Sequence, residues 1–225
     1  MHSHLIPGID DGSPSMEVSL RYLSALAQLG YQKIITTPHI LSDLYPNTST
    51  GIRNGLAALQ QEVQAQGIGV QVEAASEYFV DQWFEHLLNQ QDVLSFGSSN
   101  YVLIEMSFVT PSPQLEQAVF TLQTMGYQPI LAHPERYGYW HDVAVKRFQH
   151  LKELGCLLQL NVPSLMGYYG PAIKKVALSL IKAHLVDFWG TDLHHDRHLE
   201  LLTKHQFDVE LHQLLDKYPL LNTSI

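Results

Sequence analysis

The sequence has one cysteine and no long hydrophobic run. Cys156 stands alone among 225 residues, so no disulfide framework can form within the chain, and a reducing compartment fits. No apolar stretch approaches the roughly 20 residues that a membrane-spanning helix needs. No basic-then-apolar segment precedes His2. These absences predict a cytoplasmic protein that does not insert into a membrane.

Positive charge is also scarce. The sequence carries 13 Lys and Arg residues against 22 Asp and Glu residues, a net charge of −9 with histidine counted as neutral. This balance argues against a nucleic-acid-binding protein, which needs a basic face. An acidic chain can still bind phosphate when metal ions supply the positive charge.

The motifs of several phosphate-handling classes are missing. Cysteine-dependent phosphatases require C-x5-R, but the residue at that distance from Cys156 is Val162. No D-x-D aspartyl-phosphate motif, Walker loop or G-x-G-x-x-G pattern occurs. Phosphate chemistry in this chain would therefore depend on other groups.

Short apolar runs alternate with helix-period segments. The runs predict seven strands, at the opening HSHLI, Lys33–Thr37, Val70–Ala75, Tyr101–Met106, Pro129–Ala132, Cys156–Asn161 and Val186–Gly190. Amphipathic helices are predicted at Met16–Leu29, Ile52–Gln66, Leu115–Met125, His141–Leu154 and Pro171–Ala183. Repeated β-α alternation indicates a parallel sheet with crossover helices. Seven such units in a single domain, residues 1–225, favour a small (β/α) barrel over an open doubly wound sheet.

Histidine and acidic residues recur where these strands end. The residues in such positions are His2, His4, His39, Glu77, Glu105, His133, Asp192 and His194. In barrel folds the active site gathers at the C-terminal ends of the strands. Each of these residues alone is more often a structural hydrogen-bonding group. A chance distribution would also place them on helices and at strand starts, so the joint pattern favours one metal site.

The spacing of the motifs suits metal binding. In the pairs His2/His4 and Asp192/His194, the two side chains are two residues apart, so on a strand they point to the same face. Mixed imidazole and carboxylate ligands suit Mn, Fe or Zn rather than Ca. Several carboxylates among them allow bridging, and hence two or three ions roughly 3.5–4 Å apart.

Four motifs together resemble one known superfamily. H-x-H-x-x-P-G-I-D-D-G, T-P-H, H-P-E-R and T-D-x-H are similar to the PHP (polymerase and histidinol phosphatase) superfamily. PGIDDG and AHPERY are typical of its bacterial branch of manganese-dependent capsule and exopolysaccharide tyrosine phosphatases, and the similarity covers almost the whole chain. The resemblance implies a distorted (β/α)7 TIM-like barrel and two or three Mn²⁺ ions, with Fe, Zn or Co as alternatives. Only Met1 precedes His2, so the first strand is either short or begins upstream of this sequence.

The resemblance also implies roles for individual residues. It assigns one ion to His2, His4, Glu77 and Asp192, a second to Glu77, Glu105 and His133, and a third to Asp11, His39 and His194. Arg136 would bind the phosphoryl oxygens, and Arg197 is the only candidate for the family's second phosphate arginine. Candidate proton donors are His195 and His198, and the expected substrate-binding aromatic residue is Tyr168.

The implied reaction is hydrolysis of phosphotyrosine. The ions would supply an activated water as the nucleophile and, together with Arg136 and Arg197, would offset the charge on the phosphoryl oxygens. The implied partner is a bacterial tyrosine kinase with a phosphorylated, tyrosine-rich tail, which controls capsule or exopolysaccharide synthesis.

Other functions remain open at this point. One is a small-molecule phosphomonoesterase such as a histidinol-phosphate phosphatase. Another is a PHP-like module that binds metal without catalysis, against which the full ligand set argues. A third is a nuclease, against which the net charge of −9 argues. The oligomeric state does not follow from the sequence.

Overall fold

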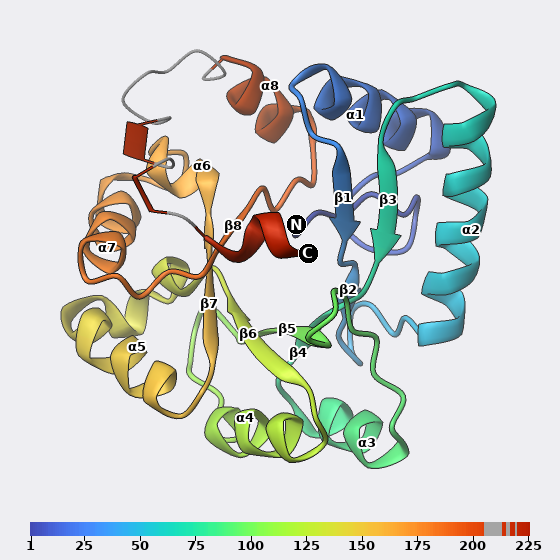
Figure 1. Ribbon diagram of the computed structural model, residues 1–225. Coiled ribbons are helices and arrows are strands. Elements are labelled where there is room, and N and C mark those ends of the chain that lie inside the picture. Colours follow the sequence, from blue (N-terminus) through green and yellow to red (C-terminus); the bar gives the residue numbers. More distant parts are fainter. Residues whose placement is uncertain (205–212, 215–216, 219) are drawn as a thin grey trace.

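The strands form two parallel sheets surrounded by helices (Figure 1). The computed structural model describes residues 1–204, 213–214, 217–218 and 220–225. The strands in these residues are β1 Lys33–Thr36, β2 His39–Ile40, β3 Gln71–Ala74, β4 Glu77–Phe79, β5 Tyr101–Glu105, β6 Gln128–Ala132, β7 Leu157–Asn161 and β8 Phe188–Gly190. The larger described sheet has the order β2-β4-β5-β6-β7-β8, and the smaller one pairs β1 with β3.

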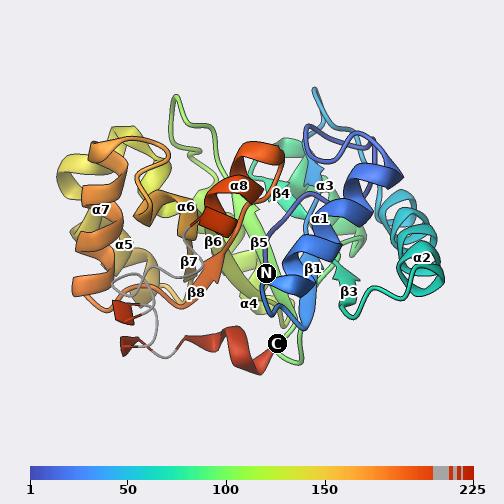
Figure 2. The same ribbon diagram turned by 90° about the horizontal axis from the view of Figure 1, so that it is seen from above.

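Helices cover the outside of the sheets. The α-helices are α1 Met16–Gln28, α2 Ser49–Ala65, α3 Gln82–Gln90, α4 Leu115–Thr124, α5 Ala144–Glu153, α6 Val162–Leu165, α7 Pro171–Lys182 and α8 Asp196–Lys204. Short 3-10 helices are η1 Pro134–Arg136, η2 Gly138–Val143 and η3 Leu221–Ser224. Figure 2 shows α5 and α7 on one side of the molecule and α1 and α2 on the opposite side. Within the described part of the chain, no helix has the length and apolar character needed to cross a membrane.

Side-chain caps mark where several helices begin. Ser15, Thr48 and Asp81 each accept a hydrogen bond from a backbone N–H in the first turn of α1, α2 and α3. The helices predicted from the sequence appear as α1, α2, α4, α5 and α7, with ends shifted by a few residues. The sequence pattern did not predict α3, α6 or α8.

The two sheets are joined through two extended segments, each of which contributes one strand to each sheet. β1 and β2 are consecutive parts of one extended segment, as are β3 and β4. Pro38, between β1 and β2, has no N–H to donate, but its carbonyl accepts a hydrogen bond from the N–H of Glu77 at 3.1 Å. Pairing then resumes with His39 opposite Glu77. The interruption therefore sets two metal-type side chains beside each other at the start of β2 and β4.

The opening segment is not a strand. Ser3 makes an isolated parallel bridge to Leu193. The N–H of His4 donates to the carbonyl of Leu193 at 3.0 Å, and the N–H of Thr37 donates to the carbonyl of Ser3 at 2.7 Å. This segment thus lies between the end of β1 and the loop after β8. The described residues do not form one continuous closed ladder, so the observed fold is a mixed α/β arrangement of parallel strands.

The central strands are buried on both faces. Leu103, Ile104, Ile130, Leu131 and Leu158 are fully shielded from solvent. This is the burial expected when helices cover both sides of a parallel sheet. The buried strands give a rigid base for the side chains at their C-terminal ends.

Candidate active site

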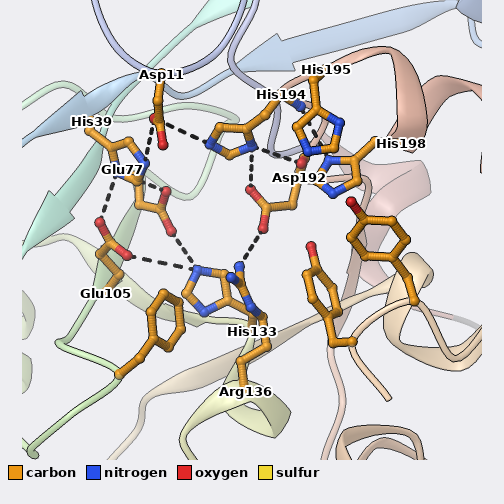
Figure 3. Close-up of a pocket in the computed structure, with 13 residues that line it drawn as sticks. Asp11, His39, Glu77, Glu105, His133, Arg136, Asp192, His194, His195 and His198 are labelled. Carbon is orange, nitrogen blue, oxygen red and sulfur yellow. Dashed lines mark hydrogen bonds and ion pairs between the residues drawn. The ribbon is translucent and has the colours of Figure 1, made fainter.

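A cavity of about 330 Å³ lies at the ends of these strands (Figure 3). Its lining combines carboxylates, imidazoles, one guanidinium and three aromatic rings. The lining residues are Asp11, His39, Glu77, Glu105, Phe108, His133, Arg136, Tyr168, Tyr169, Asp192, His194, His195 and His198. The sequence-predicted ligands His2 and His4 are buried behind this lining. Side chains from residue 2 to residue 198 therefore meet in one place.

One group of four potential ligands is completely buried. It contains His2, His4, Glu77 and Asp192, whose ligand atoms lie within 4.8 Å of one another. The Nε2 atom of His2 is 3.2 Å from Oε2 of Glu77 and 3.2 Å from Oδ1 of Asp192. Nε2 of His4 lies 3.4 Å and 3.6 Å from the same two oxygens. The arrangement matches the set expected for the first ion.

Glu77 also belongs to a second group, with His39 and Glu105. Nδ1 of His39 is 2.8 Å from Oε1 of Glu105 and 3.3 Å from Oε2 of Glu77. His133, expected in this group, contacts it through Nε2, at 3.0 Å from Oε1 of Glu77 and 3.9 Å from Oε2 of Glu105. The structure thus adds His39 to the neighbourhood of the second expected ion.

The third group lies nearest to solvent and contains His4, Asp11, His39 and His194. Oδ1 of Asp11 is 3.5 Å from Nε2 of His39 and 3.6 Å from Nε2 of His194. Asp11 is also the most exposed of these side chains. The two nitrogens of His39 therefore face two different groups, which the sequence did not indicate.

Buried atoms without hydrogen-bond partners converge on these groups. Among the described residues they include Nε2 of His2 and His4, Nδ1 of His39, Oε2 of Glu77 and Oδ1 of Asp192. Leaving a buried polar atom unpaired is unfavourable, by about 1–3 kcal/mol for each group. Divalent ions would satisfy all of these atoms, so the residues present fit a metal cluster.

Three of the ligand-type residues have a strained backbone. His2, His133 and Asp192 adopt positive φ angles of 67°, 35° and 49°. Non-glycine residues seldom adopt this conformation, and such strain clusters at functional sites. In this protein the strained backbone directs the side chains of these three residues toward the metal-type groups.

The acidic residues hold protons on nearby imidazoles. Burial opposes the charged form of His2, but Glu77 and Asp192 outweigh it and raise the pKa of His2 well above its ordinary value. His39 is also buried, and neighbouring carboxylates, Glu77 foremost, raise its pKa to about 10. In contrast, burial lowers the pKa of His194 to about 4. Without ions, the centre is therefore protonated on some imidazoles at neutral pH.

Ion binding should consequently release protons. Because His2 and His39 have raised pKa values, a divalent ion has to displace their protons, and binding becomes tighter as pH rises toward about 10. We expect the apparent affinity for Mn²⁺ to rise about tenfold per pH unit for each displaced proton. Titration calorimetry in two buffers of different ionisation enthalpy measures the protons released.

A surface histidine provides the control for this titration. His150 pairs with Glu116 at 3.5 Å outside the cavity, so His150→Ala should release the same number of protons as the wild type. An affinity for Mn²⁺ that does not change between pH 6 and pH 8 would contradict the expectation.

Asp10 is a site residue that the sequence analysis missed. Its Oδ2 accepts a hydrogen bond from Nδ1 of His4 at 2.8 Å and another from the N–H of His39 at 3.1 Å. Because Nδ1 of His4 carries the proton, Nε2 is left free to bind an ion. A Cβ on Gly12 would lie 2.3 Å from Cβ of His4, so only glycine lets this turn approach. The available signal was the first aspartate of the IDDG turn, which stands next to the predicted ligand Asp11.

Arg136 is held in a fixed position at the cavity wall. It ends η1, and its Nη1 donates to Oδ2 of Asp192 at 2.8 Å. The guanidinium lies over the rings of Phe108 and Tyr169, at 4.3 Å and 4.5 Å from their centres. The two rings hold the guanidinium in place beside the cavity that it lines, where a planar cation can bind a phosphate group.

Arg197 lies elsewhere. The lining residues His194 and His195 directly precede α8, and His198 lies in its first turn. Arg197 is exposed and does not line the cavity. Adjacent residues on a helix point about 100° apart, so His198 in the cavity directs Arg197 away. The structure does not bring the expected second arginine to the site.

Tyr168 does reach the cavity. Its ring packs edge-on against His198, with ring centres 4.8 Å apart, and its side chain stays partly exposed at the mouth. Tyr169 and Phe108, which also line the cavity, both pack on Arg136. The cavity therefore joins a polar floor to an aromatic rim.

Comparison with known proteins relates this site to a described family. A family model for capsular polysaccharide synthesis, CpsB/CapC, matches residues 1–202. The tyrosine-protein phosphatase YwqE of Bacillus subtilis (strain 168) is 30% identical over 194 residues, which are 86% of this chain and 76% of YwqE. The putative tyrosine-protein phosphatase CapC of Staphylococcus aureus is 29% identical over 212 residues, covering 92% of this chain and 81% of CapC.

Solved structures agree with the sequence comparison. A chain from the crystal structures of YwqE from Bacillus subtilis and CpsB from Streptococcus pneumoniae, described as unique metal-dependent tyrosine phosphatases, superposes with a TM-score of 0.82. It is 28% identical, and the match covers 97% of this chain and 94% of that one. The phosphotriesterase homology protein of Escherichia coli shares the fold at 13% identity, with a TM-score of 0.59 over 96% of this chain and 90% of its own. The protein whose cavity is described here belongs to the CpsB/CapC family of capsular polysaccharide synthesis proteins.

Proposed function

We propose that the protein is a metal-dependent protein-tyrosine phosphatase. The observation that carries this proposal is the meeting of three metal-type groups and Arg136 in one cavity. Membership of the CpsB/CapC family supports it, because relatives in the comparison are tyrosine-protein phosphatases. We further propose that residues 1–225 form one domain with a distorted (β/α)7 TIM-like barrel. In this barrel the opening segment takes the position of the first strand through the bridge between Ser3 and Leu193.

The proposed ligand sets are those that the resemblance implies, and they overlap with the three observed groups. His2, His4, Glu77 and Asp192 would hold one ion, Glu77, Glu105 and His133 a second, and Asp11, His39 and His194 a third. Manganese is the proposed metal, since imidazoles and carboxylates in this mixture suit it and also Fe, Zn or Co. When bound, such ions lower the pKa of a coordinated water and offset the charge of a phosphoryl group.

The remaining groups of the cavity bind and orient the substrate. Arg136 would hold two phosphoryl oxygens through its planar fork, which the rings of Phe108 and Tyr169 keep in place. Tyr168 would contact the phenyl ring at the mouth. His195, directly before α8, and His198, in its first turn, are further polar groups that line the cavity, whereas Arg197 does not.

The leaving group explains why a strong proton donor is not needed. Phenolate has a conjugate acid with a pKa of about 10, so it departs with less assistance than an alkoxide. Burial lowers the pKa of His198 to about 4, so this imidazole is neutral at pH 7 and a weak acid. The site thus suits an aryl phosphate better than an alkyl phosphate.

We also propose a substrate protein and a cellular compartment for this reaction. The substrate would be the phosphorylated, tyrosine-rich tail of a bacterial tyrosine kinase that controls capsule or exopolysaccharide synthesis. Such a tail is disordered and enters an open mouth readily. We place the reaction in the cytoplasm and propose neither a nucleic-acid partner nor membrane insertion.

A comparison of two substrates tests the proposal. With Mn²⁺ present, we expect rapid hydrolysis of a phosphotyrosine peptide, and a kcat/KM for histidinol phosphate lower by about 10²-fold or more. The reason is that a general acid contributes about 10²–10⁴-fold, and only the alkyl ester depends on one. Phosphate release on each substrate is the measurement.

The other functions predict different results. Cleavage of histidinol phosphate alone would identify a small-molecule phosphatase. Binding of ions without hydrolysis of either substrate would identify a non-catalytic module. Single-stranded DNA should remain intact on a gel, and its cleavage would favour a nuclease.

A further inference from the structure

Two amides on β7 connect metal-type residues that lie far apart in the sequence. Nδ1 of His2 is 2.5 Å from Oε1 of Gln159, and Nε2 of Gln159 donates to Oδ1 of Asn161 at 2.9 Å. Nδ2 of Asn161 donates in turn to Oδ2 of Asp192 at 2.7 Å. The same oxygen accepts the hydrogen bond from Arg136. A continuous chain of hydrogen bonds thus runs from His2 to Arg136.

The direction of these bonds determines which atoms stay free. An amide oxygen can only accept, so Nδ1 of His2 keeps its proton, and Nε2 is the nitrogen that gives up its proton when an ion binds. Two donors occupy Oδ2 of Asp192, which leaves Oδ1 unpaired. The free Nε2 and Oδ1 lie 3.2 Å apart, in the same ligand group. The amide chain therefore points one ligand atom of each residue at a shared position.

The fold makes room for this chain. Gln159 and Asn161 are two positions apart on β7, so their side chains share one face, and both are fully buried. A Cβ at Gly190 on β8 would lie 2.2 Å from Nε2 of Gln159 and 3.1 Å from Cβ of His2. Any larger residue at position 190 would displace the amide. The N–H of Asn161 is itself anchored by the buried carboxylate of Glu135 at 3.0 Å.

Neutral amides have an electrostatic advantage here. His4 is oriented by the carboxylate of Asp10, whereas His2 is oriented by an amide. The centre already contains the carboxylates of Glu77, Glu105 and Asp192. Another buried negative charge would need compensation, while an amide orients the imidazole without adding charge.

We propose that Gln159 and Asn161 are positioning residues that set the ligand geometry of the first ion and tie it to Arg136. This inference rests on the proposed function, because it concerns the same centre. It predicts that removing the amide of Gln159 weakens ion binding at one site. It also predicts that removing the amide of Asn161 loosens Asp192, to which Arg136 donates, and raises KM for the phosphorylated substrate.

The test uses the full chain and Mn²⁺ as the probe. Gln159→Met keeps the side-chain length but cannot accept the proton of His2, so we expect the affinity for one Mn²⁺ ion to fall about 10–100-fold. Gln159→Glu can still accept that proton but adds a buried charge and loses the hydrogen bond to Asn161, so it should restore only part of the lost affinity. Calorimetry and metal analysis after dialysis measure affinity and stoichiometry.

A neighbouring strand supplies the matched control. Gln128 on β6 donates to the carbonyl of Gly155 at 2.7 Å, away from the cavity. Gln128→Met loses a comparable amide hydrogen bond and should bind Mn²⁺ as the wild type does. Asn161→Ala should raise KM more than it lowers kcat. A general loss of folded protein would instead lower kcat and leave KM unchanged.

The outcomes separate this inference from the proposed function. If Gln159→Met binds Mn²⁺ as tightly as the wild type, the positioning role is overturned, whatever the activity. If Gln159→Met is weakened and Gln159→Glu rescued, but the wild type does not hydrolyse the phosphotyrosine peptide, only the proposed function fails. A wild type that binds no Mn²⁺ would overturn both.

Discussion

Glu77→Gln should abolish most of the phosphatase activity. Glu77 has one oxygen in contact with His133 and the other beside His2, His4 and His39, so it serves two ligand groups at once. A neutral amide at this position binds divalent ions poorly and cannot balance their charge. We expect kcat/KM to fall by more than about 10³-fold, since ion clusters supply several kcal/mol of transition-state stabilisation.

The measurement combines activity with metal content. Phosphate release from a phosphotyrosine peptide gives kcat/KM, and elemental analysis gives the number of ions bound. Glu73→Gln is the matched control, because Glu73 on β3 pairs with Lys33 at 2.9 Å and does not line the cavity. A Glu77→Gln variant with activity within tenfold of the wild type would contradict the proposed centre.

Arg136→Ala should cause the second-largest loss. Its guanidinium is the only Arg or Lys side chain among the residues that line the described cavity. Removing a preorganised donor to a developing oxyanion costs about 10²–10³-fold in rate, and we expect a loss of that size here. Arg136→Lys should recover only part of it, because an ammonium is a point charge without the planar fork.

Arg197→Ala is the matched control for this experiment. Arg197 is exposed on α8 and outside the cavity lining, so its loss should change kcat/KM by less than about twofold, as is usual for surface substitutions. Bound metal should be unchanged in this control. If Arg197→Ala loses as much activity as Arg136→Ala, α8 must reposition on substrate binding, and the proposed assignment would be wrong.

The positions of the ligand-type residues could be read from the sequence because of the regularity of parallel strands. His133 and Asp192 follow β6 and β8, and Glu105 ends β5. Since parallel strands all end at the same edge, residues that follow them must be neighbours, even when far apart in the chain. The same regularity predicted most helices and the alternation of strands and helices.

Which residues share a ligand group depends on the direction in which each side-chain atom points, and the position of a residue in the sequence does not determine that direction. The sequence places His39 near the centre, but it cannot tell that Nδ1 faces Glu105 while Nε2 faces Asp11. Nor does it distinguish the neighbours Asp10 and Asp11, of which the first orients His4 and the second faces the cavity. A turn around Gly12 decides between them.

The composition and order of the residues were enough to predict parallel β-α units with imidazoles and carboxylates at one edge, because strand period and strand direction are local properties of the chain. The side-chain directions came from packing between distant segments. Gln159 meets His2 across 157 positions, two rings clamp Arg136, and the helical rotation at His198 turns Arg197 outward. Contacts of this kind depend on which surfaces the folded chain presses together, and no local pattern records them.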